Sequence, residues 1–89
     1  MASSTIKRFM RTKTLTQEVS INGGERISKG FTAPTGTNKI IAATMVESPN
    51  KDWVICRPYI INGTSVWVYM HNEYTGTLSG SLSVLIIYE

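Results

Sequence analysis

Residues 52–71, DWVICRPYIINGTSVWVYMH, carry the clearest indication of the fold. Two runs rich in β-branched and aromatic residues flank Asn62-Gly63 in this stretch. A tight type I′ hairpin loop needs positive φ at both central positions, and Asn-Gly adopts that conformation at low cost. The stretch therefore predicts two antiparallel strands, Asp52 to Ile61 and Thr64 to His71. The Asn62-Gly63-Thr64 sequon is read as a turn, because nothing else in the sequence indicates secretion.

The predicted turn also assigns side chains to faces. A two-residue loop places Ile61 opposite Thr64 and so fixes the register of the whole hairpin. The face expected to point to the core holds Ile55, Tyr59, Ile61, Val66, Val68 and Met70. The opposite face holds Cys56, Pro58, Ile60, Trp67, Tyr69 and His71. Both faces are apolar, so both need a cover.

A second sheet of a sandwich would cover one of these faces. An exposed apolar face of this size usually marks an interaction site, so we expect another subunit to cover the other face. The expected subunit interface consists of Trp67, Tyr69, His71 and Ile60. In the alternative, the chain alone closes into a barrel and covers both faces itself.

Turn signals divide the remaining sequence into further short strands, which is typical of a sandwich or barrel. These strands are expected at residues 14–21, 25–31, 38–46 and 80–88. The last of them has apolar residues on both faces: Leu82, Val84, Ile86 and Tyr88 on one, and Leu85 and Ile87 after Ser81 and Ser83 on the other. The fold class predicted is all-β: a small antiparallel β-sandwich of about six strands. We expect the sandwich domain to span residues 14–89, preceded by an extended basic arm at residues 1–13.

The size of the chain favours assembly. A domain of 89 residues has a core of marginal stability on its own. Disulfides, a metal or oligomerisation usually reinforce such small domains. Cys56 is the only cysteine, which excludes an internal disulfide, and His71 is the only histidine to accompany it as a zinc ligand. We therefore expect oligomerisation, with no metal and no cofactor.

The basic residues are concentrated at the N-terminus. Residues 1–13 carry Lys7, Arg8, Arg11 and Lys13 and no acidic residue, a charge of +4. Residues 14–89 carry the other five basic and all six acidic side chains, a charge of −1. Basic arms bind nucleic acid, anionic surfaces or an acidic patch of a partner. We expect this arm to dock on a larger particle, and a solvated tail is the alternative.

The hydropathy of the chain predicts neither a membrane span nor a signal peptide. The longest strongly apolar run, Val84 to Tyr88, is too short to cross a bilayer. The first 13 residues lack the apolar stretch of a signal peptide. The lone cysteine fits synthesis in a reducing cytoplasm.

No catalytic set is apparent, so we expect no enzymatic activity. The carboxylates are scattered, and His71 is the only histidine. Cys56 and His71 share a face in the expected register, but Cys56 lies among apolar residues, where a thiol is usually inert. Nucleic-acid binding is disfavoured, because the body of the chain lacks basic residues around its aromatic residues.

The polar loop at residues 72–79 holds the best candidate for external recognition. Tyr74 is a loop aromatic flanked by Asn72 and Glu73. Aromatic residues with a polar group suit contact surfaces, and the C–H faces of sugars stack on such rings. We therefore expect a ligand-binding site at Tyr74, Asn72 and Glu73, with a host-surface saccharide as the possible ligand.

Four segments carry a family resemblance: the Gly23-Gly24 turn, TAPTG at residues 32–36 before KIIA at 39–42, VWVYMHN at 66–72, and the ending GSLSVLIIYE at 80–89. Through them residues 20–89 resemble the tip and knob domains of bacteriophage tail fibres and receptor-binding proteins. The resemblance implies a homotrimeric β-sandwich on a virion surface, made in the host cytoplasm and involved in host attachment.

The short arm differs from the long shaft of such fibres, which favours a head fibre, a capsid decoration protein or a small tail component. One alternative is a decoration protein that stabilises the capsid without receptor activity. The other is a free carbohydrate- or nucleic-acid-binding module.

Overall fold

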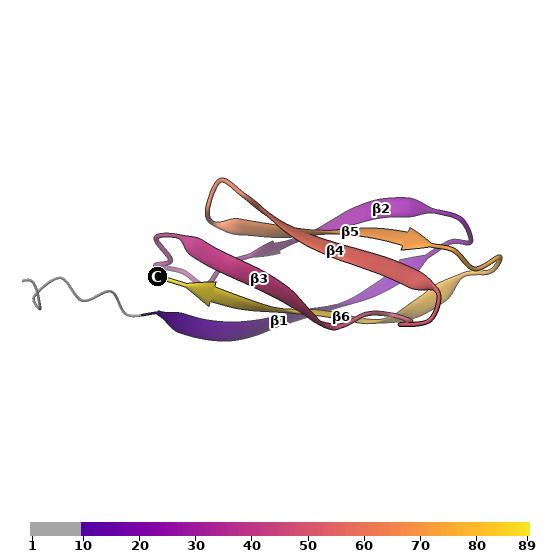
Figure 1. Cartoon of the computed structure of the whole chain (residues 1–89), viewed down its shortest axis with the longest axis horizontal. Helices are drawn as coiled ribbons and strands as arrows, with labels where there is room; N and C mark the ends of the chain where they lie inside the picture. The colour runs from indigo at the N-terminus through magenta and orange to yellow at the C-terminus, as the bar shows by residue number, and fades with distance from the viewer. Residues whose placement is uncertain (1–9) are drawn as a thin grey trace, which may run out of the picture.

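The structure is a computed structural model that describes residues 10–89, and within this range every regular element is a β-strand (Figure 1). The strands are β1 (Arg11–Ile21), β2 (Arg26–Thr32), β3 (Ile40–Glu47), β4 (Val54–Ile61), β5 (Ser65–Asn72) and β6 (Leu78–Tyr88). This confirms the all-β fold. Among the described residues no helix has the length and apolar character to cross a membrane.

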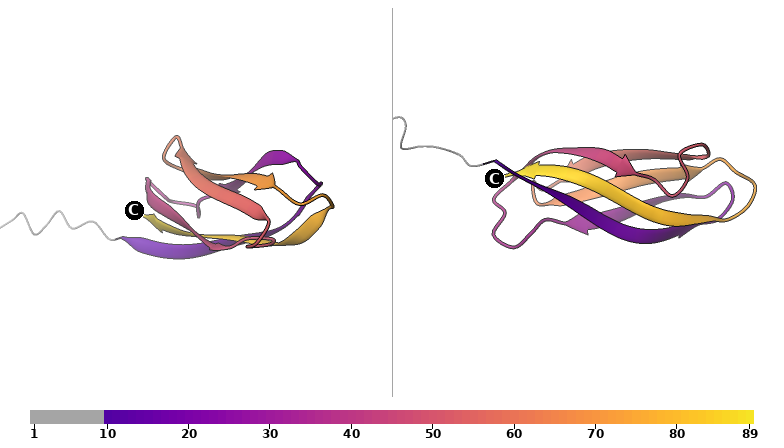
Figure 2. Two further views of the ribbon diagram at one scale, coloured as in Figure 1. Left: turned by 45° about the vertical axis from the view of Figure 1, so that its right-hand side comes forward. Right: turned by 90° about the horizontal axis from the view of Figure 1, so that it is seen from below.

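The strands form two three-stranded antiparallel sheets that face each other. One sheet has the order β1-β6-β3 and the other the order β2-β5-β4. Figure 2 (right) shows the β1-β6-β3 sheet in front of the second sheet. The strand order, which the sequence did not predict, places β5 and β6 at the centre of their sheets, where each pairs along both edges.

The core lies between these two central strands. From β5 it contains Val66, Val68 and Met70, and from β6 Leu82, Val84 and Ile86, all fully buried. Burying such a side chain contributes about 1.5–3 kcal/mol to stability. The expected core face of β5 is therefore confirmed, and of the two apolar faces of β6 the one with Leu82, Val84 and Ile86 is buried.

The expected register of the β4–β5 hairpin is wrong. Ile61 pairs with Ser65, so the loop contains Thr64 in addition to Asn62 and Gly63. The predicted positive φ angles are present, 57° at Asn62 and 71° at Gly63. The extra residue shifts β4 by one position relative to β5, which reverses the two faces of β4.

Tertiary hydrogen bonds account for the longer loop. The carbonyl of Gly63 accepts from the backbone N–H of Ile40, and the carbonyl of Thr64 accepts from that of Ala33 at 3.2 Å. These carbonyls bind the segment that links the two sheets, so Thr64 belongs to the loop and the ladder begins at Ser65.

Both described chain ends lie at the same end of the sandwich (Figure 1). Arg11 pairs with Tyr88, and the guanidinium carbon of Arg11 lies 4.8 Å from the centre of the Tyr88 ring. Because β1 begins at Arg11, Arg11 and Lys13 are strand residues, although both were expected in the arm. Lys7 and Arg8 lie outside the described residues. The turns β1–β2 and β3–β4 and the loop β5–β6 gather at the opposite end, which we call the loop tip.

Candidate functional site

The outer face of the β2-β5-β4 sheet carries an unusual set of side chains, which we call the aromatic face. It consists of Arg26, Ile55, Arg57, Tyr59, Ile61, Trp67, Tyr69 and His71. Ile55, Tyr59 and Ile61 remain 41%, 41% and 37% exposed. The reversed faces of β4 explain this exposure, because these three residues were expected in the core.

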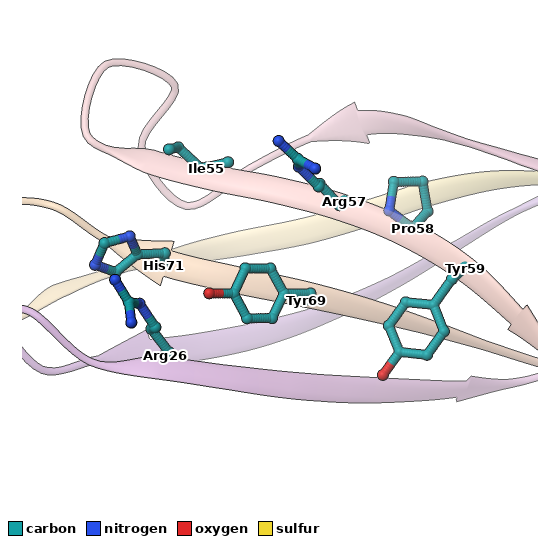
Figure 3. A pocket seen from close by; sticks show the side chains of 7 residues that line it. All are labelled: Arg26, Ile55, Arg57, Pro58, Tyr59, Tyr69 and His71. Carbon is teal, nitrogen blue, oxygen red and sulfur yellow. The ribbon is translucent and has the colours of Figure 1, made fainter.

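The aromatic rings are supported by the sheet itself. A Cβ at Gly30 would lie 3.0 Å from two carbon atoms of the Trp67 indole, so the ring covers this glycine on the neighbouring strand. The Tyr59 hydroxyl donates to Ser28 Oγ at 3.3 Å, so its side chain reaches from β4 across β5 to β2 (Figure 3). Through these contacts the side chains of Trp67 and Tyr59 lie against the neighbouring strands of the sheet.

An open depression of about 590 Å³ lies on this face. Its lining includes Arg26, Arg57, Tyr59, Tyr69 and His71 (Figure 3). No Asp or Glu lies at an outward position of β2, β4 or β5, and neither arginine forms an ion pair with another described residue. The face therefore combines apolar contact area with uncompensated positive charge, which suits a partner surface carrying carboxylates.

The outer face of the β1-β6-β3 sheet is different, and we call it the hydroxyl face. Its strand positions hold Thr12, Thr14, Thr16, Glu18, Ser20, Ala42, Thr44, Glu47, Ser79, Ser81, Ser83, Leu85 and Ile87. The hydroxyls pair across strands, with Thr16 Oγ1 2.8 Å from Ser83 Oγ and Ser79 Oγ donating to Ser20 Oγ at 3.0 Å. Ser81 donates to the Glu18 carboxylate.

At the loop tip, Tyr74 pairs with Trp53. Their ring centroids are 5.2 Å apart with planes tilted by 50°, and the residues stay 42% and 46% exposed. The backbone holds the pair together, because Glu73 N–H donates to the Trp53 carbonyl at 2.9 Å. The sequence prediction included Tyr74 and Glu73 but did not place Trp53 beside them. Asn50 could have indicated the turn that orients Trp53, because its side chain accepts a hydrogen bond from Trp53 N–H.

Asn72 occupies a different place from the expected ligand site. It is fully buried at the end of β5, and its Nδ2 donates to the carbonyls of Ile21 and Gly76, both at 3.0 Å, and of Asn22 at 3.2 Å. Its Oδ1 accepts from Tyr74 N–H at 2.8 Å. This side chain therefore joins the loops of the tip, and its hydrogen-bonding groups are engaged within the chain.

The four expected interface residues divide between two faces. Trp67, Tyr69 and His71 lie together on the aromatic face, as expected. Ile60 pairs with the buried Val66 and so lies on the core side of the sheet, which makes its expected place beside Trp67 wrong.

The structure also separates the residues considered for chemistry. Cys56 pairs with the buried Met70, so Cys56 and His71 project from opposite sides of the sheet. Burial raises the pKa of the Cys56 thiol, which disfavours the reactive thiolate. Within residues 10–89, no three His, Cys, Asp or Glu side chains are grouped in a way that would hold a metal ion.

Comparison with protein-family models, curated proteins and solved structures gave no match to this chain.

Proposed function

We propose that this chain is a non-enzymatic structural module that associates with copies of itself through the aromatic face. The observation that carries the proposal is the exposure of Ile55, Tyr59 and Ile61 on that face of a small domain. Contiguous apolar surface flanked by polar residues is typical of protein–protein contacts, and Tyr, Trp and Arg dominate their energetics.

The resemblance of residues 20–89 to phage fibre tips leads us to propose three copies and a place on a virion surface. In this arrangement residues 1–13, including Lys7 and Arg8, dock on other virion proteins. The position of the described chain ends at one end of the sandwich supports this arrangement, because it leaves the loop tip pointing away from the anchor. In the alternative role, as a decoration protein without receptor activity, the arrangement is the same but the loop tip binds no receptor.

The loop tip supports a second proposed role, attachment to a host-surface saccharide. Trp53 and Tyr74 present two exposed rings on loops held by backbone hydrogen bonds. A rigid aromatic pair binds with little loss of conformational entropy, and its ring faces suit the C–H faces of a sugar.

A pair of matched variants tests both roles. Tyr59 and Tyr74 are 41% and 42% exposed, so Tyr59→Ser and Tyr74→Ser remove similar side chains from different surfaces. We expect Tyr59→Ser to weaken self-association by about 1–2 kcal/mol. It should leave binding on a glycan array unchanged, and Tyr74→Ser should do the reverse.

Solution mass by light scattering over a concentration series provides the first measurement. A wild-type chain that stays monomeric at every concentration would contradict the assembly proposal. Wild-type association without glycan binding would favour the decoration role over attachment.

A further inference from the structure

The two outer faces of the sandwich carry opposite charges. At outward positions, the aromatic face has Arg26 and Arg57 and no carboxylate, whereas the hydroxyl face has Glu18 and Glu47 and no Lys or Arg. Arg11 and Lys13 do not alter this, because they pair with Tyr88 and Ile86 and so share the core side of their sheet.

The charges also have matching positions. Arg26 pairs with His71 and Arg57 with Tyr69, so the two arginines lie on either side of β5, one same-face step apart. Glu18 pairs with Ser81 and Glu47 with Ser83, so the two glutamates lie on either side of β6 with the same step. Strand spacing and rise place the backbone positions of each pair roughly 12 Å apart.

We infer that the aromatic face of one copy binds the hydroxyl face of the next copy, so that Arg26 and Arg57 meet Glu18 and Glu47. The inference rests on the proposed self-association and names its partner surface. A two-fold contact between aromatic faces would instead bring the arginines of both copies together, and like charges at an interface oppose association.

The hydroxyl face offers a partner apolar contact area as well as carboxylates. Leu85 and Ile87 are partly buried residues along its central strand, and serines and threonines surround them. Tyrosine and tryptophan side chains contact such mixed surfaces well, because they combine apolar area with a polar group. The resulting contact is heterologous. Because the two faces lie on opposite sides of the sandwich, repeated contacts continue as a stack, so the inference specifies the contact between copies and not a closed set of three.

Charge reversal tests this geometry. The first variant is Arg26→Glu with Arg57→Glu, which makes both outer faces acidic. The second is Glu18→Lys with Glu47→Lys, which makes both faces basic. We expect each variant alone to associate roughly tenfold more weakly than wild type, and an equimolar mixture of the two to recover association. Lys51→Glu, in the exposed β3–β4 turn, is the control and should associate as wild type does.

Light scattering and circular dichroism on all samples separate the outcomes. The inference is supported if both variants are folded, do not associate alone and associate when they are mixed. A wild-type chain that associates while both charge-reversed variants still associate alone would overturn it and leave the proposed self-association in place. A wild-type chain that never associates would overturn the proposed self-association itself.

Discussion

The two sheets of this sandwich have equal numbers of strands and bury similar inner faces, yet their outer faces differ in chemistry. On the hydroxyl face, serines and threonines bond to one another across strands, and these hydrogen bonds satisfy much of the surface within the chain. On the aromatic face, Tyr59 and Trp67 rest on Ser28 and Gly30 and leave ring surface and two arginines exposed. The hydroxyl face is therefore well satisfied in water, whereas the exposed rings and the two arginines of the aromatic face gain contacts when another surface covers them.

The largest expected loss of stability comes from substitution of Asn72, whose side chain connects the two sheets. Asn72 lies at the end of β5, in the β2-β5-β4 sheet. It donates to the carbonyl of Ile21 at the end of β1, in the β1-β6-β3 sheet. Asn72→Ala would remove the donor from the buried carbonyl of Ile21 and from the partly buried carbonyls of Asn22 and Gly76, and we expect a loss of about 3 kcal/mol in the free energy of unfolding. Urea denaturation followed by circular dichroism measures the change.

The matched control for this prediction is Asn50→Ala at the same loop tip. Asn50 Oδ1 accepts from the N–H groups of Asp52 and Trp53, but these hydrogen bonds are exposed. We expect a loss of about 1 kcal/mol, because water replaces the lost acceptor. Equal losses for the two variants would show that burial of Asn72 does not contribute as described.

The second prediction changes the aromatic face alone. A Cβ at Gly30 would already touch the Trp67 indole at 3.0 Å, so the larger side chain of Gly30→Val must displace the ring. We expect a loss of about 1 kcal/mol in stability and a red shift of tryptophan emission as the ring becomes more exposed.

Gly76→Ala is the control, because a Cβ there would meet the Tyr74 ring at an ordinary contact distance of 3.4 Å. It should leave the fluorescence unchanged. If Gly30→Val also left the tryptophan emission unchanged, the indole would not rest on Gly30.

The third prediction changes the hydroxyl face. Thr16→Val keeps the shape of the side chain and removes the hydrogen bond between Thr16 and Ser83. We expect a loss of about 0.5–1 kcal/mol, since the pair is only partly buried. Thr14→Val on the same strand is the comparison, and a smaller loss at Thr14 would indicate that the cross-strand pair stabilises the fold.

The smallest expected effect concerns Cys56, which lies on the core side of the β2-β5-β4 sheet, opposite the aromatic face. Burial raises the pKa of Cys56, so folding favours the protonated thiol. This contribution is fully present below the pKa of the unfolded thiol, about 8.5, and is lost as the pH rises through the raised value of the folded state.

Urea denaturation at about pH 7.5 and about pH 9.5 measures this effect. The wild-type chain should lose slightly more stability between these pH values than Cys56→Ala, which cannot titrate there. Identical losses in the two chains would remove Cys56 as the cause.

Much of the fold could be predicted from the sequence, and the errors have identifiable causes. Short runs of β-branched and aromatic residues between turn signals located β5 and β6, because that pattern is local. The buried face of β5 was also predicted correctly. The register of β4 was missed because it depends on Ile40 and Ala33, which bind the carbonyls of the hairpin loop from another part of the chain. Local turn preference cannot reveal such distant donors.

In the candidate site, too, local features were predicted and contacts between distant segments were missed. Tyr74 was found as a loop aromatic, but its contact with Trp53 depends on two different loops meeting at the tip. Asn72 was expected to face a ligand, since asparagine is common in loops. Its burial follows from the carbonyls of Ile21 and Asn22, which lie about fifty residues away in sequence.

The placement of the chain ends has a mechanical consequence. β1 and β6 pair along 11 positions, from Arg11 with Tyr88 at one end to Ile21 with Leu78 at the other. If the chain is held before Arg11 and pulled at the loop tip, the force runs along these strands, perpendicular to their hydrogen bonds. Many hydrogen bonds then share the load in shear. Pulling the two chain ends apart would instead open the same ladder one pair at a time, starting at Arg11 and Tyr88.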